Sequence, residues 1–153
     1  MRVSMRGRYA LRAMVELAAH ADRPVQRREI AARQAISANY VAQLFGLLRE
    51  AGLVRSVKGP GGGYMLTRAP DNISVGDVLR AVEGPMAIAE CLLPTNAVRC
   101  QRLAVCAVQP FWLRLNRALE ETADSTSLRD LCHAHVASNG EGAEPSSSDR
   151  ERR

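Results

Sequence analysis

Apolar positions recur at helical spacing in three segments near the start of the chain. The pattern predicts an amphipathic first helix over Arg8–His20 and a second helix over about Arg27–Gln34. A third helix is expected after Ser37, a good N-cap residue, and should stop at Gly52. Three helices with short connections are typical of a helix-turn-helix. The buried face of the second helix is expected to comprise Ile30, Ala31 and Ala35.

Two β-prone segments follow, Leu53–Val57 and Tyr64–Thr67, with the glycine-rich sequence Lys58–Gly63 between them. This pattern predicts a hairpin, or wing, whose turn can approach another molecule closely because glycine has no side chain. A nucleotide-binding phosphate loop is the alternative interpretation. The sequence disfavours it because the Gly-Lys-Ser/Thr ending is missing and a hairpin, rather than a helix, follows.

The rest of the chain predicts a short helix over Val75–Glu83, a weakly periodic stretch, a long helix from about Gln109 to Ala123 and a short helix over Ser127–Val136. The expected fold class is mainly α with a small β-hairpin wing: a winged helix-turn-helix plus a long dimerisation helix. The predicted divisions are a DNA-binding domain (1–68), a connecting helix (69–84), a cysteine segment (85–108), the last two helices (109–137) and a disordered tail (138–153).

Charge is divided unevenly along the chain. Residues 1–68 carry twelve Arg or Lys and four Asp or Glu, a net charge of +8, whereas residues 69–153 carry nine and twelve, a net charge of −3. A basic half attracts polyanions such as nucleic acid, although a solvated basic face without a partner is the alternative. No apolar run has the length of a membrane span or a secretion signal, so we expect a cytoplasmic protein without membrane contact.

The start of the third helix holds the side chains expected to read DNA. Asn39 and Gln43 can pair with base edges in the major groove, while Ser37 and Tyr40 can reach phosphates. Taken singly, Asn39 and Gln43 are equally compatible with plain solvent exposure. Because one half-site contact is small, useful affinity calls for a homodimer on a near-palindromic operator. The wing residues expected to touch double-stranded DNA are Lys58, Gly59, Pro60 and Gly61.

Three cysteines lie in the cysteine segment: Cys91, Cys100 and Cys106, spaced Cys-x8-Cys-x5-Cys. Soft thiolates from a loop suit an iron-sulfur cluster or zinc, and structural zinc sites usually show tighter pairs and a fourth ligand. Cys106 should lie just before the long helix, whose N-terminus favours a thiolate. Three unrelated loop thiols are the alternative. Cys132 is expected to be a core residue rather than a ligand, because it follows Leu128 and Leu131 in a helical apolar pattern.

Several motifs occur together from Met1 to about Asp130, and in addition to the three cysteines they are Gly7-Arg8-Tyr9-Ala10, Ser37, Asn39-Tyr40, Gln43-Leu44, Ala51 to Tyr64, Ser74 to Val78 and Val82-Glu83-Gly84-Pro85. In these residues the chain resembles the Rrf-two family of winged-helix transcription regulators, which includes iron-sulfur sensors. The resemblance implies a dimer joined through residues 111–123. It also implies a cluster held by Cys91, Cys100 and Cys106, close to the DNA-binding unit.

The chain departs from the better-known branches of that family. Gln109 stands where one branch has a ligating histidine, Arg8 where another has an acidic ligand, and Ala42 where the first has an acidic residue that faces DNA. The segment Met86–Cys91 instead resembles a branch in which three cysteines hold a 4Fe-4S cluster. We therefore favour 4Fe-4S over 2Fe-2S. The expected weak fourth ligands are Glu90, Gln109, His133, His135 or solvent.

The resulting expectation is a repressor or dual regulator whose operator binding follows the state of an iron-sulfur cluster that senses iron, redox state or nitric oxide. A cluster-free regulator in which the same cysteines oxidise directly is the main alternative. An enzyme using Cys106 with His133 or His135 is disfavoured, because nothing in the sequence places a histidine beside a nucleophile. A metal-binding adaptor that meets another protein through the long helix is the third alternative.

Overall fold

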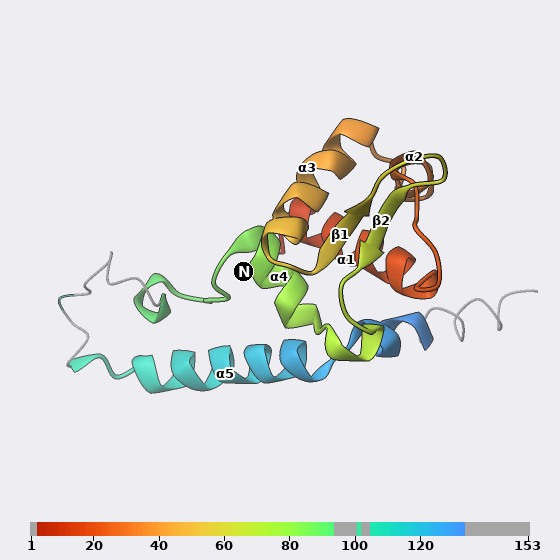
Figure 1. Cartoon of the computed structure of the whole chain (residues 1–153). Coiled ribbons are helices and arrows are strands. Elements are labelled where there is room, and N and C mark those ends of the chain that lie inside the picture. The colour runs from red at the N-terminus through yellow and green to blue at the C-terminus, as the bar shows by residue number, and fades with distance from the viewer. Residues whose placement is uncertain (1–2, 94–100, 102–104, 134–153) are drawn as a thin grey trace, which may run out of the picture.

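The computed structural model describes residues 3–93, 101 and 105–133, and it shows a helical protein with one small hairpin (Figure 1). We call α1, α2, α3 and the hairpin the reading head, which lies above the long helix α5, with α4 between the two (Figure 1). Residues 128–133 form a further helical turn. The elements are α1 (Met5–Ala19), α2 (Arg27–Gln34), α3 (Ala38–Glu50), β1 (Val54–Val57), β2 (Gly63–Leu66), η1 (Pro70–Asn72), α4 (Val75–Glu83), η2 (Glu90–Leu92) and α5 (Gln109–Ser125).

Serine side chains begin three of the helices. The Oγ atom of Ser37 accepts a hydrogen bond from the backbone N–H of Tyr40 at 3.1 Å, which confirms the predicted cap of α3. Ser74 and Asp77 form a reciprocal capping box at the start of α4. Helix α1 starts at Met5, three residues earlier than predicted, because Ser4 caps it.

The turn between α2 and α3 corrects one sequence expectation. Ala35 is exposed rather than buried, and its φ of 53° places it in the left-handed region. Its N–H bonds back to carbonyls of α2, so this residue ends the helix and reverses the chain toward α3. Gln34 takes the buried position instead, beside Ile30 and Ala31.

The predicted wing is an antiparallel pair in which Val54 faces Leu66 and Val57 faces Gly63. Tyr64 also exchanges two backbone hydrogen bonds with Val25, at 3.0 and 2.9 Å, so the wing is tied to the α1–α2 loop. A Cβ atom on Gly63 would lie only 2.6 Å from the carbonyl carbon of Val25. Glycine at this position is therefore a requirement of the wing's attachment.

One hydrophobic core holds the reading head and the C-terminal turn together. Phe45, Met14 and Ile73 are almost completely buried, and Leu128 is fully buried among them. The short helix predicted over residues 127–136 is observed as far as residue 133. The predicted tail, residues 138–153, lies outside the described part of the chain. Among the described residues, no helix is long and apolar enough to span a bilayer.

Candidate nucleic-acid interface and cysteine segment

Helix α3 presents a polar face to solvent. Asn39 and Gln43 are both exposed and lie one turn apart, as expected for side chains that read base edges. Gly46, which is one further turn along the same face, has open space where a Cβ atom would stand. Sequence reasoning did not single out Gly46, although its i+3 spacing from Gln43 was a usable signal. The middle of this face therefore has no bulky side chain.

Tyr40 is more enclosed than its neighbours on α3. Its side chain is half-buried and packs against the core, and its ring meets that of Tyr9 edge-on, with centroids 6.1 Å apart. This contact attaches the first turn of α3 to α1. Ser37 is exposed, and because its oxygen accepts the capping bond, its hydroxyl proton remains free for another acceptor.

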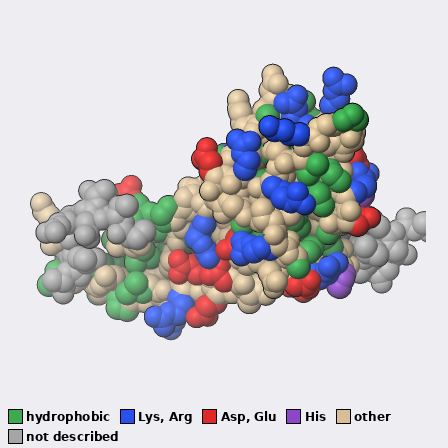
Figure 2. Space-filling model, in the orientation of Figure 1, with side chains coloured by type: hydrophobic (Ala, Val, Ile, Leu, Met, Phe, Trp, Pro, Cys, Tyr) green, Lys and Arg blue, Asp and Glu red, His purple; other side chains and the backbone are tan. Residues whose placement is uncertain are grey.

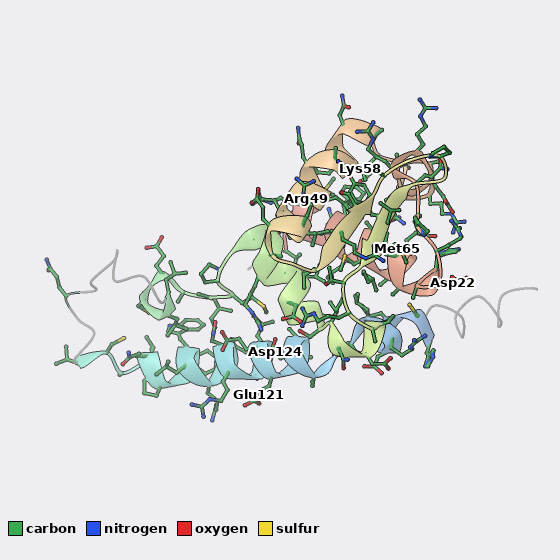
Figure 3. The ribbon with its side chains drawn as sticks, in the orientation of Figure 1. Asp22, Arg49, Lys58, Met65, Glu121 and Asp124 are labelled. Carbon is green, nitrogen blue, oxygen red and sulfur yellow. The ribbon has the colours of Figure 1, made fainter. Side chains whose placement is uncertain are left out.

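The wing turn is exposed at Lys58, Gly59, Pro60 and Gly61. Gly59 and Gly61 have φ values of 97° and 74°, a conformation that favours glycine. Phe45 of α3 packs against Tyr64 of β2, with ring centroids 4.3 Å apart, so the wing is fixed relative to the reading helix. Lys58 and Arg49 both lie on the reading head, far from Glu121 on α5 (Figure 3).

A cleft of about 420 Å³ separates the wing from the start of α2. Its lining includes Arg27, Arg28 and Ser56 together with wing glycines. No side chain caps α2 at Gln26, so the N–H groups of its first turn stay available, and a helix N-terminus favours an anion. Sequence reasoning missed both arginines, although their place at a predicted helix start was a usable signal.

The arginines of the reading head fall into two groups. Arg23 of the α1–α2 loop pairs with Glu29 of α2 at 2.9 Å. Arg33 pairs with Glu29 on α2 itself at 3.0 Å and with Glu16 on α1. The hydrogen bond from Arg23 holds the pKa of Glu29 below its ordinary value. Glu16, His20 and Glu29 come within 4.8 Å of one another, but arginines already pair with both carboxylates. Within the described part of the chain, four cations of the interface have no carboxylate partner: Arg27, Arg28, Arg55 and Lys58.

The surface reflects this division of charge. Basic side chains gather on the reading head, whereas acidic side chains gather lower down, around α4 and α5 (Figure 2). A duplex that approaches the reading head would therefore meet mainly positive charge.

The structure describes two of the three predicted cluster ligands. Cys91 lies in η2 and Cys106 lies three residues before α5, and both are half-buried free thiols. The backbone N–H of Gln109 donates to the Cys106 carbonyl at 3.3 Å, which places this cysteine against the first turn of α5. Cys100 and His135 lie outside the described residues. Glu90 and His133 are exposed, and Gln109 is half-buried.

A buried amide holds the first part of the cysteine segment on α5. The Oδ1 atom of Asn116 accepts a hydrogen bond from the Ile88 N–H at 3.0 Å, and Asn116 is only 8% exposed. Ile88 is three residues before Cys91. Sequence reasoning missed Asn116; the signal was a polar residue in helical register with Trp112 and Ala123.

Helix α5 also exposes apolar side chains, two of which, Phe111 and Leu115, lie one turn apart. Phe111, Leu113 and Leu115 are 49%, 50% and 44% exposed. These side chains lie within residues 111–123, the stretch for which the sequence resemblance implied a dimer contact. The structure holds a single chain, so the covering partner remains a prediction.

Cys132 behaves as a packing residue. It lies against the core, its thiol donates to the Val15 carbonyl at 3.6 Å, and burial raises its pKa. A raised pKa leaves less of the thiolate that metals bind. This agrees with the expectation that Cys132 is not a ligand.

Comparison with known proteins decides the family. The Rrf2 (Rrf-two) family model, described as an iron-dependent transcriptional regulator, matches residues 3–134. The chain belongs to the Rrf2 family. It is 39% identical over 132 residues to the transcriptional regulator CymR of Bacillus subtilis, covering 86% of this chain and 89% of that protein. It is 41% identical over 132 residues to the regulator IscR of Aliivibrio salmonicida, covering 86% and 77%.

Solved Rrf2 structures share the fold. CymR, described as the global cysteine regulator of B. subtilis, aligns with a TM-score of 0.71 at 37% identity over 88% of this chain and 98% of that one. IscR of T. potens gives a TM-score of 0.71 at 33% identity over 95% and 94%. The predicted family and fold class are confirmed. The relatives are named as transcriptional regulators, and the protein is a DNA-binding transcription regulator rather than an enzyme.

Proposed function

We propose that the protein binds a near-palindromic operator as a homodimer, with α3 of each copy in a major groove. The observation that carries this proposal is the exposed face of Asn39 and Gln43, flanked by cations without carboxylate partners on α2 and the wing. The predicted division into DNA-binding domain, connecting helix, cysteine segment and C-terminal helices is part of the proposal.

Side chains in this interface divide into two roles. Asn39 and Gln43 read base edges, and Ser37, Tyr40, Arg27 and Arg28 contact phosphates. The wing residues Lys58, Gly59, Pro60 and Gly61 contact the backbone or the adjacent minor groove.

Fluorescence anisotropy with operator and scrambled duplexes tests these roles. Gln43→Ala should weaken operator binding at least about tenfold while leaving scrambled DNA unaffected, because a paired base contact contributes about 1–3 kcal/mol of discrimination. Arg28→Ala should weaken binding to both duplexes and reduce the salt dependence of the binding constant by about one ion per half-site. Ser125→Ala, an exposed neutral change at the end of α5 and outside residues 111–123, is the control. Equal losses for Gln43→Ala on both duplexes would contradict the proposed reading role.

The regulatory part of the proposal is an iron-sulfur cluster held by Cys91, Cys100 and Cys106, with 4Fe-4S favoured over 2Fe-2S. The donor chemistry supports it, because Cys91 and Cys106 are free, half-buried thiols. When bound, such a group supplies a redox-active centre that reacts with oxygen or nitric oxide and responds to iron supply. One branch of the family has a histidine as the fourth cluster ligand; the candidates in this chain are Glu90, Gln109, His133, His135 and solvent.

Two features of the chain favour a cluster at this site. The first turn of α5 lies beside Cys106, and the positive end of its helix dipole would favour an anionic cluster there. Asn116 fixes the backbone three residues before Cys91. Cys91 and Cys106 are only half-buried, which would leave the site open to small reactants, as a sensor requires.

Anaerobic purification followed by native mass spectrometry and iron and sulfide counts tests the cluster. We expect a brown dimer that loses iron when Cys91→Ser, Cys100→Ser or Cys106→Ser is introduced. Cys132→Ser is the matched control and should keep its iron, because that thiol contacts the core. An iron-free wild type that still responds to its signal would contradict the cluster.

A cluster-free thiol switch is the second candidate, and two observations favour it. Cys91 and Cys106 are free thiols with partial exposure, and CymR of B. subtilis is described as a global cysteine regulator. This candidate predicts that diamide changes operator affinity of iron-free protein, and that Cys91→Ser or Cys106→Ser abolishes the change. No response of iron-free protein to oxidant would exclude it.

A further inference from the structure

Glu83 stands at an unfavourable end of its own helix. It is the last residue of α4, where the helix dipole disfavours a carboxylate. Its Oε1 atom instead accepts a hydrogen bond from the Gly7 N–H at 2.9 Å, at the start of α1. The hydroxyl of Ser4, the N-cap of α1, donates to the same oxygen. The Glu83 carboxylate thus stabilises the first turn of α1 rather than its own helix α4.

Gly7 permits this approach. A Cβ atom at Gly7 would lie 2.6 Å from Glu83 Oε1 and 2.9 Å from a methyl group of Val3. Any other residue at this position would have to displace the Glu83 carboxylate or Val3. Glycine here therefore preserves one specific contact between α1 and α4. We call Ser4, Gly7 and Glu83 the clasp.

The clasp lies between the cysteine segment and the reading helix. On one side, Gly84 follows Glu83 directly with a φ of 86°, and Ile88 is held by Asn116 shortly before Cys91. On the other side, Tyr9 is two residues beyond Gly7, and its ring contacts Tyr40 in the first turn of α3. Helices α1 and α4 pack against each other, in agreement with these contacts.

We propose that Glu83 is a positioning residue that transmits the state of the cysteine segment to the reading helix through the clasp. A change in the segment that moves residue 84 would shift the carboxylate, release the start of α1 and tilt Tyr9 against Tyr40. The inference rests on the proposed function, because it needs a cysteine state that alters DNA binding. It adds the residues that carry the coupling.

The coupling is measured as the ratio of operator dissociation constants for iron-free protein and for protein reconstituted anaerobically with iron and sulfide. Couplings of this kind typically amount to about 5–150-fold. We expect Glu83→Ala to bring the ratio within about twofold of one, with iron and sulfide per chain unchanged. Glu83→Gln keeps an acceptor for Gly7 and should restore most of the ratio. Ser125→Ala, an exposed neutral change at the last residue of α5 and outside residues 111–123, should leave the ratio as in wild type.

Amide hydrogen exchange supplies a second readout. In Glu83→Ala the Gly7 amide should exchange faster whether or not iron is present, because its acceptor is gone. A folded Glu83→Ala protein that keeps the wild-type ratio, or that fails to hold iron, would overturn the inference. If Glu83→Ala does not fold, Ser4→Ala replaces it and should bring the ratio closer to one. A wild-type ratio in Ser4→Ala would also overturn the inference. A wild-type ratio of one would refute the proposed function instead.

Discussion

The reading head and the cysteine segment are held in place by different means. In the head, core side chains such as Phe45, Met14 and Val25 are almost completely buried, and Gly63 is required by a close backbone approach. In the cysteine segment, no described residue is fully buried, and the Ile88–Asn116 hydrogen bond anchors its first part. The head is therefore fixed by its core, whereas the described part of the segment has no such core, and we expect it to respond to a ligand or to oxidation.

The long helix α5 has both a packed face and exposed apolar side chains. One face, with Asn116 and Ala123, packs toward α4, and Asp124 accepts from Arg80 at 2.9 Å. Phe111 and Leu115, one turn apart on the same helix, are exposed. An apolar face of this kind is expected to gain a partner, and matched substitutions separate its contribution from that of the head.

The two phenylalanines of the chain give the largest expected difference. Phe45→Ala should lower the free energy of unfolding by about 3–5 kcal/mol, because it empties a core site. Phe111→Ala should change the stability of the monomer by less than about 0.5 kcal/mol but weaken self-association. Urea unfolding and sedimentation velocity measure the two effects. Equal destabilisation by both changes, without an effect on association, would contradict the comparison.

Two glycines separate a close backbone contact from an unusual backbone conformation. Gly63→Ala places a methyl group against the Val25 carbonyl and should cost about 2–3 kcal/mol and detach the wing. Gly84→Ala has open space, but its φ of 86° with a ψ of −159° is a conformation adopted essentially by glycine alone, so it should cost about 1–3 kcal/mol without detaching the wing. Thermal unfolding and operator affinity check both variants. A Gly63→Ala protein with wild-type affinity would show that the wing attachment is dispensable.

Two asparagines separate burial from recognition. Asn116→Ala leaves the Ile88 N–H without its acceptor and should cost about 1–3 kcal/mol. Asn39→Ala lies on an exposed surface and should change stability by less than about 0.5 kcal/mol while weakening operator binding. Calorimetry and anisotropy measure these quantities. A large loss of stability in Asn39→Ala, or a loss of operator binding without a loss of stability in Asn116→Ala, would show that the two roles are wrongly assigned.

The smallest expected effect is the pH dependence of the Glu29 ion pair. Arg23 lowers the pKa of Glu29 in the folded state, so the pair contributes stability above the ordinary glutamate pKa. This contribution disappears as pH falls through the lowered value. Glu29→Gln should therefore have a lower Tm than wild type at pH 7, and the two Tm values should converge below about pH 4. A constant Tm difference across this range would contradict the ion pair's role.

The sequence alone determined most of the reading head. Helical spacing, serine caps and glycine-rich punctuation located the helices and the hairpin, because these signals act between residues close in the chain. They also predicted which residues of α3 and the wing face outward. The motif Gly7-Arg8-Tyr9-Ala10 carried part of the family resemblance, but the reason for its glycine was not visible in the local sequence.

Only the tertiary structure decided which distant groups meet. It brought Glu83 to the start of α1, Asn116 to Ile88, and Arg27 and Arg28 to the wing, across separations that no local pattern encodes. It also exchanged Ala35 for Gln34 on the buried face of α2, because a left-handed turn residue cannot continue the helix. Local sequence thus set the elements, and packing between them set the contacts through which the cysteine segment can reach DNA.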